Sequence, residues 1–206
     1  MNRRRHIVLF FSFAFVWLVA LVAVSLLFSR SLERANSVGV GAVASGLLYG
    51  VVFVALQSLL EEVFFRGAYF YIKRRASFES QWFKILYIVL SSLLFSAFQI
   101  FNSEVQNNTF VFVLLLDYFL IGVLFSYADI RLGSLAPSYG IHFINNIYTF
   151  FVVASKNSSS PFKSIVHLTR AEDDVLFVLT SLVIEFALTI GFTELIKRSS
   201  KVLGVD

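Results

Sequence analysis

A short stretch of charged residues, LLEEVFFRG at positions 59–67, interrupts a chain that is apolar on both sides. In a membrane protein, the carboxylates of Glu61 and Glu62 could pair with a cation or accept a proton in a reactive site. Glu62 and Arg66 are four residues apart, so on a helix they share one face and can form an ion pair. The alternative is an interfacial acidic pair that only closes a helix.

A second polar cluster, LGSLAPSYGIHFINN at positions 132–146, contains His142 and Asn146. Pro137 predicts a helix start nearby, because proline is tolerated in a first helical turn. His142 and Asn146 are then one turn apart on the same face. Polar groups inside a membrane helix face the bundle or a cavity. They could also act only as hydrogen bonds that hold helices together.

Taken together, the two stretches resemble the CPBP family of membrane-embedded proteases. That family includes the type II CAAX prenyl endopeptidases and bacteriocin-processing or self-immunity proteins. EEVFFR matches the family's EExxxR motif, and GSLAPSYGIHFINN resembles its HxxxN motif with the same Gly-Ser-Leu and Pro lead-in. The resemblance covers roughly residues 45–155. It departs at the middle motif, FxxxH, where LLFSAFQIF supplies Phe95 but places Gln99 at the histidine position.

The resemblance implies a role for each matching residue. Glu61 would be the general base that activates a water molecule. His142 and Asn146 would stabilise the oxyanion of the tetrahedral intermediate, where one fixed donor is worth about 10²–10³ in rate. Glu62 and Arg66 would hold the site together by pairing.

Gln99 changes what the resemblance implies. A glutamine side chain can position a water or the Glu61 carboxylate by hydrogen bonding, but it cannot take up a proton. If the missing histidine shares in proton transfer, the loss is of the order of 10²–10⁴ in rate. Some family members carry a metalloprotease label, and Gln99 depletes the histidine–carboxylate set that zinc would need. We therefore expect no metal and no other cofactor.

Composition identifies the class of protein that must position these residues. Of the 206 residues, 58% are hydrophobic and 15% are charged, with mean hydropathy +0.80. A soluble domain is about 45–50% apolar and about 25% charged, so we expect an integral membrane protein that forms one domain over residues 1–206. The absence of cysteine excludes disulfides and thiol chemistry. The net charge of +4 needs no nucleic acid, because basic residues that flank membrane spans account for it.

The apolar stretches predict an all-α, multi-pass helix bundle. Six stretches approach the roughly 20 residues that a membrane helix needs; they are 7–28, 38–60 running on toward 72, 82–101, 109–128, 135–154 and 174–196. The first is longer than a signal-peptide core, so we expect it to be retained. With both termini cytoplasmic, 12 of the 17 Lys and Arg residues lie inside, as the positive-inside rule requires.

The second stretch is too long for a simple span. As one helix, residues 38–72 would run about 52 Å, against a hydrocarbon core of about 30 Å. We therefore expect this helix to tilt, bend or leave the bilayer, with the acid pair in a protein-lined recess near the inner interface. Asp117 and Glu185 lie within other predicted spans, where a charge is costly, so they should face the bundle. We expect structural roles for them, and Asp117 could pair with Arg66.

Two functions remain open at this point. The first is an endopeptidase, which would cleave a membrane-embedded or lipidated peptide or protein near the cytoplasmic face. The short chain with six spans favours a bacterial plasma membrane, where bacteriocin leader processing or immunity fits better than prenyl-CAAX cleavage. The second, motivated by Gln99, is a non-cleaving homologue that acts by binding, as an immunity factor or membrane regulator. A small transporter would predict inverted repeats, and the sequence has none. Substrate, oligomeric state and the choice between Glu61 and Glu62 as base stay open.

Overall fold

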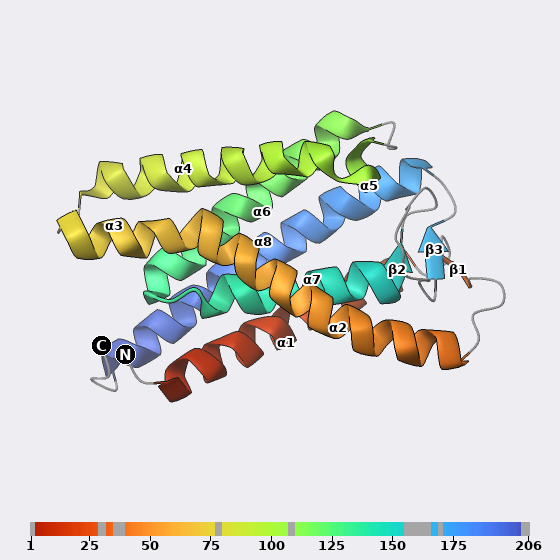
Figure 1. The fold of residues 1–206 in the computed structure, drawn as a ribbon, viewed down its shortest axis with the longest axis horizontal. Helices are drawn as coiled ribbons and strands as arrows, with labels where there is room; N and C mark the ends of the chain where they lie inside the picture. The colour runs from red at the N-terminus through yellow and green to blue at the C-terminus, as the bar shows by residue number, and fades with distance from the viewer. Residues whose placement is uncertain are drawn as a thin grey trace.

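The computed structural model is a bundle of long helices (Figure 1). The structure describes residues 3–28, 32–34, 40–76, 80–106, 110–154, 166–168 and 171–202. Its helices are α1 (Arg3–Leu27), α2 (Val40–Glu62), α3 (Ala68–Ala76), α4 (Gln81–Phe98), α5 (Ser103–Gln106), α6 (Val111–Leu132), α7 (Ala136–Phe151) and α8 (Ala171–Val202). A π-helical turn, Val63–Gly67, joins α2 to α3, and a 3₁₀ turn, Gln99–Phe101, follows α4.

The prediction of a helical bundle is confirmed, with one small addition at the end away from the termini. Three short strands, β1 (Leu32–Arg34), β2 (Val153–Ala154) and β3 (Val166–Leu168), form a sheet in the order β1-β3-β2. β1 pairs antiparallel with β3, and β2 pairs parallel with it. The sequence did not predict this sheet. Most of the connection between β2 and α8, which supplies β3, lies outside the described residues.

Four helical segments among the described residues are long and apolar enough to cross a membrane. They are Arg3–Leu27, Gln81–Phe101, Val111–Leu132 and Val175–Ser200. Many large apolar side chains point outward from the bundle, for example Phe112, which is 76% exposed, and Trp82, which is 79% exposed. An apolar exterior of this extent on long apolar helices is what an integral membrane protein presents to lipid.

The remaining two predicted spans correspond to α2 and α7. α7 has only 16 residues, which is about 24 Å of helix and shorter than the hydrocarbon core of about 30 Å. It cannot cross a bilayer of that thickness alone, so the predicted boundaries 135–154 overstate its helical length. That α2 spans the membrane stays a prediction.

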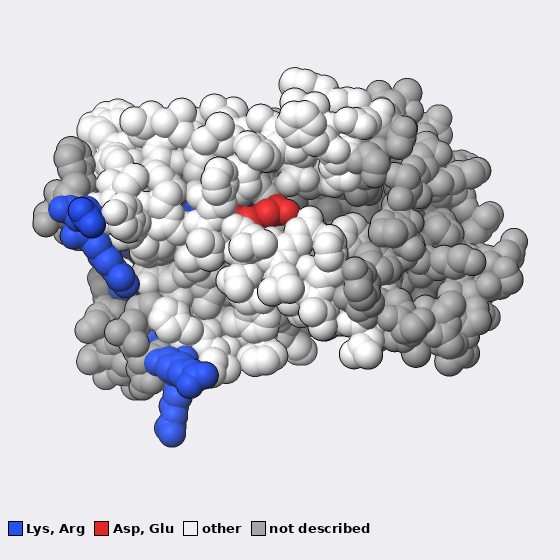
Figure 2. Space-filling view, viewed as in Figure 1, with Lys and Arg blue, Asp and Glu red and all other residues white. Residues whose placement is uncertain are grey.

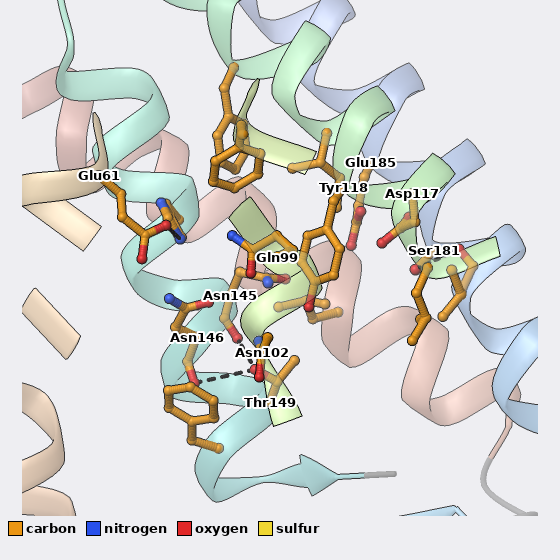
Figure 3. Close-up of a pocket in the computed structure, with 18 of the residues that line it drawn as sticks. Glu61, Gln99, Asn102, Asp117, Tyr118, Asn145, Asn146, Thr149, Ser181 and Glu185 are labelled. Atoms are coloured by element: carbon orange, nitrogen blue, oxygen red, sulfur yellow. Dashed lines mark hydrogen bonds and ion pairs between the residues drawn. The ribbon is translucent and has the colours of Figure 1, made fainter. Parts of the chain in front are cut away.

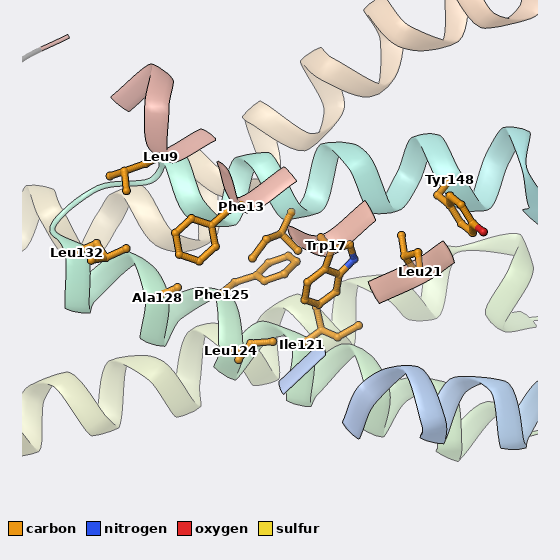
Figure 4. Close-up of a cluster of buried hydrophobic side chains, with 11 residues drawn as sticks. Leu9, Phe13, Trp17, Leu21, Ile121, Leu124, Phe125, Ala128, Leu132 and Tyr148 are labelled. Carbon is orange, nitrogen blue, oxygen red and sulfur yellow. The ribbon is translucent and has the colours of Figure 1, made fainter. Parts of the chain in front are cut away.

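The hydrophobic core lies where α1, α6 and α7 meet (Figure 4). α1 contributes a stripe of buried side chains at four-residue spacing, Leu9, Phe13, Trp17 and Leu21. These residues share one face of the helix because its period is 3.6 residues. They pack against α6 residues that include Phe125, so the first helix is an integral part of the core.

Small residues allow the helices to approach closely. A Cβ atom on Gly140 of α7 would overlap the carbonyl oxygen of Phe10 in α1. A Cβ on Gly122 of α6 would lie 3.1 Å from the Cα of Ser92 in α4. Close backbone approach at small residues is the usual packing mode of membrane helices, and here it brings α7 against α1 and α6 against α4.

α1 begins and α8 ends at the same end of the bundle as α3 (Figure 1). Basic side chains gather at that end in Figure 2, whereas acidic atoms are visible only at the centre of this face. α3 carries Lys73, Arg74 and Arg75 in its last turn. This clustering agrees with a cytoplasmic location for that end, and the orientation itself stays a prediction.

Candidate active site

The acid pair stands where the long second helix changes its winding. Glu61 and Glu62 end α2, and the π-helical turn Val63–Gly67 begins at the next residue. Beyond it the chain continues as α3 in a different direction (Figure 1). Of the alternatives that the length of this stretch allowed, the structure therefore has a bend.

Tyr87 of α4 stabilises this bend from outside. Its hydroxyl donates a hydrogen bond to the carbonyl oxygen of Phe65 at 2.7 Å and accepts one from the backbone N–H of Tyr69 at 3.0 Å. A π-helical turn disturbs the regular hydrogen-bond ladder, and backbone groups freed inside a membrane protein need other partners. Tyr87 could not be predicted from the sequence, because no local pattern links it to Tyr69 and Phe65, which lie 18 and 22 positions earlier.

The predicted ion pair between Glu62 and Arg66 is present and fully buried. Arg66 Nη1 donates to Glu62 Oε1 at 3.1 Å, and the two side chains are 1% and 0% exposed. The same carboxylate oxygen lies 2.7 Å from His142 Nδ1. Glu62 is thus shared between the motif arginine and the motif histidine. These two contacts offset part of the free-energy cost of removing the Glu62 carboxylate from water.

Glu61 lies on the other side of the same histidine. Its Oε2 is 3.7 Å from His142 Nε2, and its Oε1 accepts a hydrogen bond from Gln57 at 3.0 Å. The side chain of Glu61 is 24% exposed, in contrast to the sealed Glu62. The two ring nitrogens therefore face two different carboxylates, and the closer contact, to Glu62, fixes the ring orientation.

Aromatic rings enclose the buried arginine. Arg66 Cζ lies 4.3 Å from the centroid of Phe95 and 5.4 Å from that of Phe125, distances at which cation–π attraction operates. The ring of Phe95 also meets His142 edge to face, with centroids 5.8 Å apart. The phenylalanine of the middle motif therefore contacts both other motifs.

A buried aspartate that the sequence analysis missed anchors the start of α7. Asp129 of α6 accepts hydrogen bonds from Ser138 N at 3.0 Å and Ser138 Oγ at 2.6 Å. A carboxylate that accepts a first-turn N–H stabilises a helix N-terminus. Three residues before α7 begins, Gly133 adopts φ +68°, a conformation that a residue with a side chain would disfavour. The predicted helix start near Pro137 is confirmed, because α7 begins at Ala136.

One cavity of about 150 Å³ collects most of the predicted residues (Figure 3). Glu61, Gln99, His142 and Asn146 all line it. At about 30 Å³ per liquid water, it has room for a few waters. Glu62 and Arg66 lie behind this wall, next to His142, and are not among the lining residues.

Further polar side chains line the cavity or support it. Asn146 Nδ2 donates to Ser58 Oγ at 3.4 Å, and Trp17 Nε1 donates to Asn145 Oδ1 at 3.2 Å. Gln57 and Ser58 each precede one of the two glutamates by four residues. That helical spacing was a usable signal for both, whereas Asn145 has no such signal because its contact with Trp17 spans most of the chain.

Asp117 and Arg66 do not form the pair that the sequence allowed. Arg66 is bound to Glu62, and Asp117 lines the cavity together with Glu185. In Figure 3 both acids lie across the cavity from Glu61.

The donor set does not fit a zinc ion. Among the described residues, no group of three or more His, Cys, Asp or Glu side chains is arranged to hold a metal. His142 Nδ1 already faces Glu62, and the middle-motif position supplies an amide, Gln99, which is not one of the usual zinc ligands.

Comparison with known proteins identifies the family. Residues 42–148 match the family described as type II CAAX prenyl endopeptidase Rce1-like. No curated protein and no solved structure matches the chain significantly. The matched region begins in α2 and ends in α7, so it includes all three motifs. The chain therefore belongs to the Rce1-like type II CAAX prenyl endopeptidase family, the CPBP family, as its motifs suggested.

Proposed function

We propose that this protein is an intramembrane endopeptidase that hydrolyses a peptide bond of a membrane-embedded or lipidated peptide. The observation that carries the proposal is the convergence of Glu61, His142 and Asn146 on one small cavity in a member of an endopeptidase family. Cleavage would occur near the cytoplasmic face of a plasma membrane, at the level of the acid pair.

The proposed reaction begins with a water held between Glu61 and Gln99. Glu61 is the better candidate for the general base, because its carboxylate reaches the cavity whereas Glu62 is sealed behind His142. Glu61 removes a proton as the water attacks the scissile carbonyl carbon. When the C–N bond breaks, the same carboxyl returns that proton to the leaving amine.

His142 and Asn146 would stabilise the oxyanion. Both ring nitrogens carry a hydrogen only in the imidazolium form; in that form Nδ1–H donates to Glu62 and holds the ring so that Nε2–H points toward the cavity as a donor. The amide of Asn146 is the second donor, one helical turn away on the same helix face. Fixed donors of this kind need no reorganisation during the reaction, which is why they are effective in a water-poor site.

Gln99 supports a second candidate function, binding without cleavage. It lines the cavity at the place of the middle-motif histidine and cannot act as a proton carrier. A lapsed protease of this kind would serve as an immunity factor or as a regulator of a membrane protein.

Three forms of the full chain separate the two functions. Wild type, Glu61→Ala and Gln99→His are reconstituted in lipid nanodiscs and incubated with S-farnesylated CAAX-type peptides and with unlipidated apolar peptides. The proposal predicts cleavage by wild type and loss of cleavage in Glu61→Ala. Cleavage by Gln99→His alone would instead identify a lapsed protease, and equal cleavage by Glu61→Ala would contradict the assigned base.

A further inference from the structure

The cavity has a second acidic end that the proposed chemistry does not use. Asp117 of α6 and Glu185 of α8 line it, together with Tyr118 and Ser181. Figure 3 shows both carboxyl groups on the far side of Tyr118 from Glu61. Two helices that are far apart in sequence thus bring two acids to one wall.

These acids lack the partners that buried carboxyl groups normally have. Glu185 is 2% exposed and takes part in no hydrogen bond or ion pair with the described residues. Asp117 Oδ1 is buried without a hydrogen-bond partner. Groups that serve only to stabilise a fold are usually hydrogen-bonded when buried, because an unpaired one costs about 1–3 kcal/mol. A purely structural role therefore explains this pair poorly.

The one basic side chain among the described residues that line the cavity is His142, which is engaged by Glu61 and Glu62. Among the described lining residues there is no lysine or arginine, and the nearby Arg66 is bound to Glu62. An ionisable residue inside a membrane protein that lacks a partner marks a binding or transport function more often than a structural one. The described residues also offer no cluster that would hold a metal ion.

We propose that Asp117 and Glu185 form a subsite for a cationic group of the peptide substrate, an ammonium or guanidinium. The inference rests on the proposed function, because the cation belongs to the same peptide whose scissile bond lies at Glu61. An ammonium has three N–H donors, which the two carboxylates and the Ser181 hydroxyl can accept. The ring of Tyr118 adds an aromatic neighbour of the kind that attracts cations. The protein would thus select membrane peptides that carry a positive charge at a fixed distance from the cleaved bond.

Peptide binding tests this subsite without requiring cleavage. Three fluorescent S-farnesylcysteine peptides share one sequence, in which norleucine occupies every test position. The first has an acetylated amino terminus and no charged side chain. The second is a set of acetylated peptides, each with lysine in place of norleucine at one test position. The third has no charged side chain but keeps a free, positively charged amino terminus. Affinities are measured by anisotropy in nanodiscs on the Glu61→Gln chain, which does not consume peptide under the proposed function. Two further variants carry Glu61→Gln together with other substitutions. One adds Asp117→Asn and Glu185→Gln. The other adds Glu194→Gln and serves as a control, because it removes an acid of α8 that lies outside the cavity.

We expect one of the lysine peptides, or the peptide with the free amino terminus, to bind about tenfold tighter than the acetylated neutral peptide. Which of the two does so identifies the source of the cation. Asp117→Asn/Glu185→Gln should abolish this preference and leave the affinity for the neutral peptide unchanged, while Glu194→Gln should retain the preference.

Equal affinity for all three peptides would overturn the inference, as would a preference that survives Asp117→Asn/Glu185→Gln. A parallel loss of neutral-peptide binding and thermal stability in that variant would also overturn it, because the pair would then be structural. Failure of wild type to cleave any of the peptides would contradict the proposed function but not the subsite. The binding preference for the cationic peptides would still test the subsite.

Discussion

His142 is held by two glutamates that differ in their exposure to the cavity. Glu62 is sealed and lies 2.7 Å from Nδ1, whereas Glu61 reaches the cavity and lies 3.7 Å from Nε2. Under the proposed function, Glu62 positions the histidine and its neighbour Glu61 carries out the chemistry. The ion pair with Arg66 followed from i,i+4 spacing. The contact with His142 could not be predicted from local pattern, because it joins residues that are 80 positions apart.

This division predicts different outcomes for two isosteric substitutions. Glu62→Gln leaves the buried Arg66 without its counter-charge, and breaking such a pair costs about 3–5 kcal/mol. We expect a strongly lowered unfolding temperature in detergent, with lost activity. Glu61→Gln should unfold within a few degrees of wild type and still lose activity. Equal thermal stability of the two variants would contradict the assigned roles.

At the scale of elements, the bend between α2 and α3 depends on a residue from another helix. The apolar stretches predicted most helices to within a few residues, because length and hydropathy decide where a membrane helix can form. The π-helical turn was not predictable, since nothing in VFFRG, residues 63–67, is specific for such a turn, and Tyr87 of α4 supplies the hydrogen bonds that stabilise it. The anchoring of α7 by Asp129 likewise requires the neighbouring helix.

Tyr87→Phe should destabilise this bend. The substitution leaves the Phe65 carbonyl and the Tyr69 N–H without the hydroxyl, at a cost of about 1–3 kcal/mol. We expect a lower unfolding temperature and lower activity, because Glu61 and Glu62 directly precede the bend. Tyr127→Phe removes a hydroxyl that bonds Glu194, away from the cavity, and should retain activity. Full activity in Tyr87→Phe would show that the bend does not depend on this hydroxyl.

The close contact between α1 and α7 gives a second prediction at this scale. In Gly140→Ala the new Cβ would overlap the Phe10 carbonyl oxygen, and overpacking of this kind costs about 1–3 kcal/mol. Gly191→Ala on α8 is the matched control, since nothing lies within 4 Å of its added Cβ. It should be neutral or slightly stabilising, because alanine is the better helix former. Thermal unfolding of both variants in detergent measures the difference, and equal effects would contradict the contact.

At the scale of the whole molecule, polarity is distributed along one axis. The termini and α3 with its basic turn share one end, and the small sheet occupies the other (Figure 1). Composition predicted this asymmetry through the placement of Lys and Arg. It could not predict the sheet, because β1 is far in the chain from β2 and β3, and each strand has only two or three residues.

The chain's lack of cysteine allows a direct test of orientation. Arg75→Cys in α3 and Glu33→Cys in β1 each introduce a single thiol at opposite ends. In intact cells, a membrane-impermeant maleimide should label Glu33→Cys and leave Arg75→Cys unlabelled until the cells are permeabilised. The reverse pattern would place the basic end and both termini outside.

The central claim is that the cavity formed by Glu61, His142 and Asn146 uses a water molecule to cleave a peptide bond. The most direct test is mass spectrometry of products formed by wild type and Glu61→Gln in nanodiscs prepared in ¹⁸O water. The account predicts that wild type releases a fragment with one ¹⁸O atom in its new carboxylate, and that Glu61→Gln releases none. Product from Glu61→Gln at the wild-type rate, or no product from wild type with any of the membrane peptides, would contradict it.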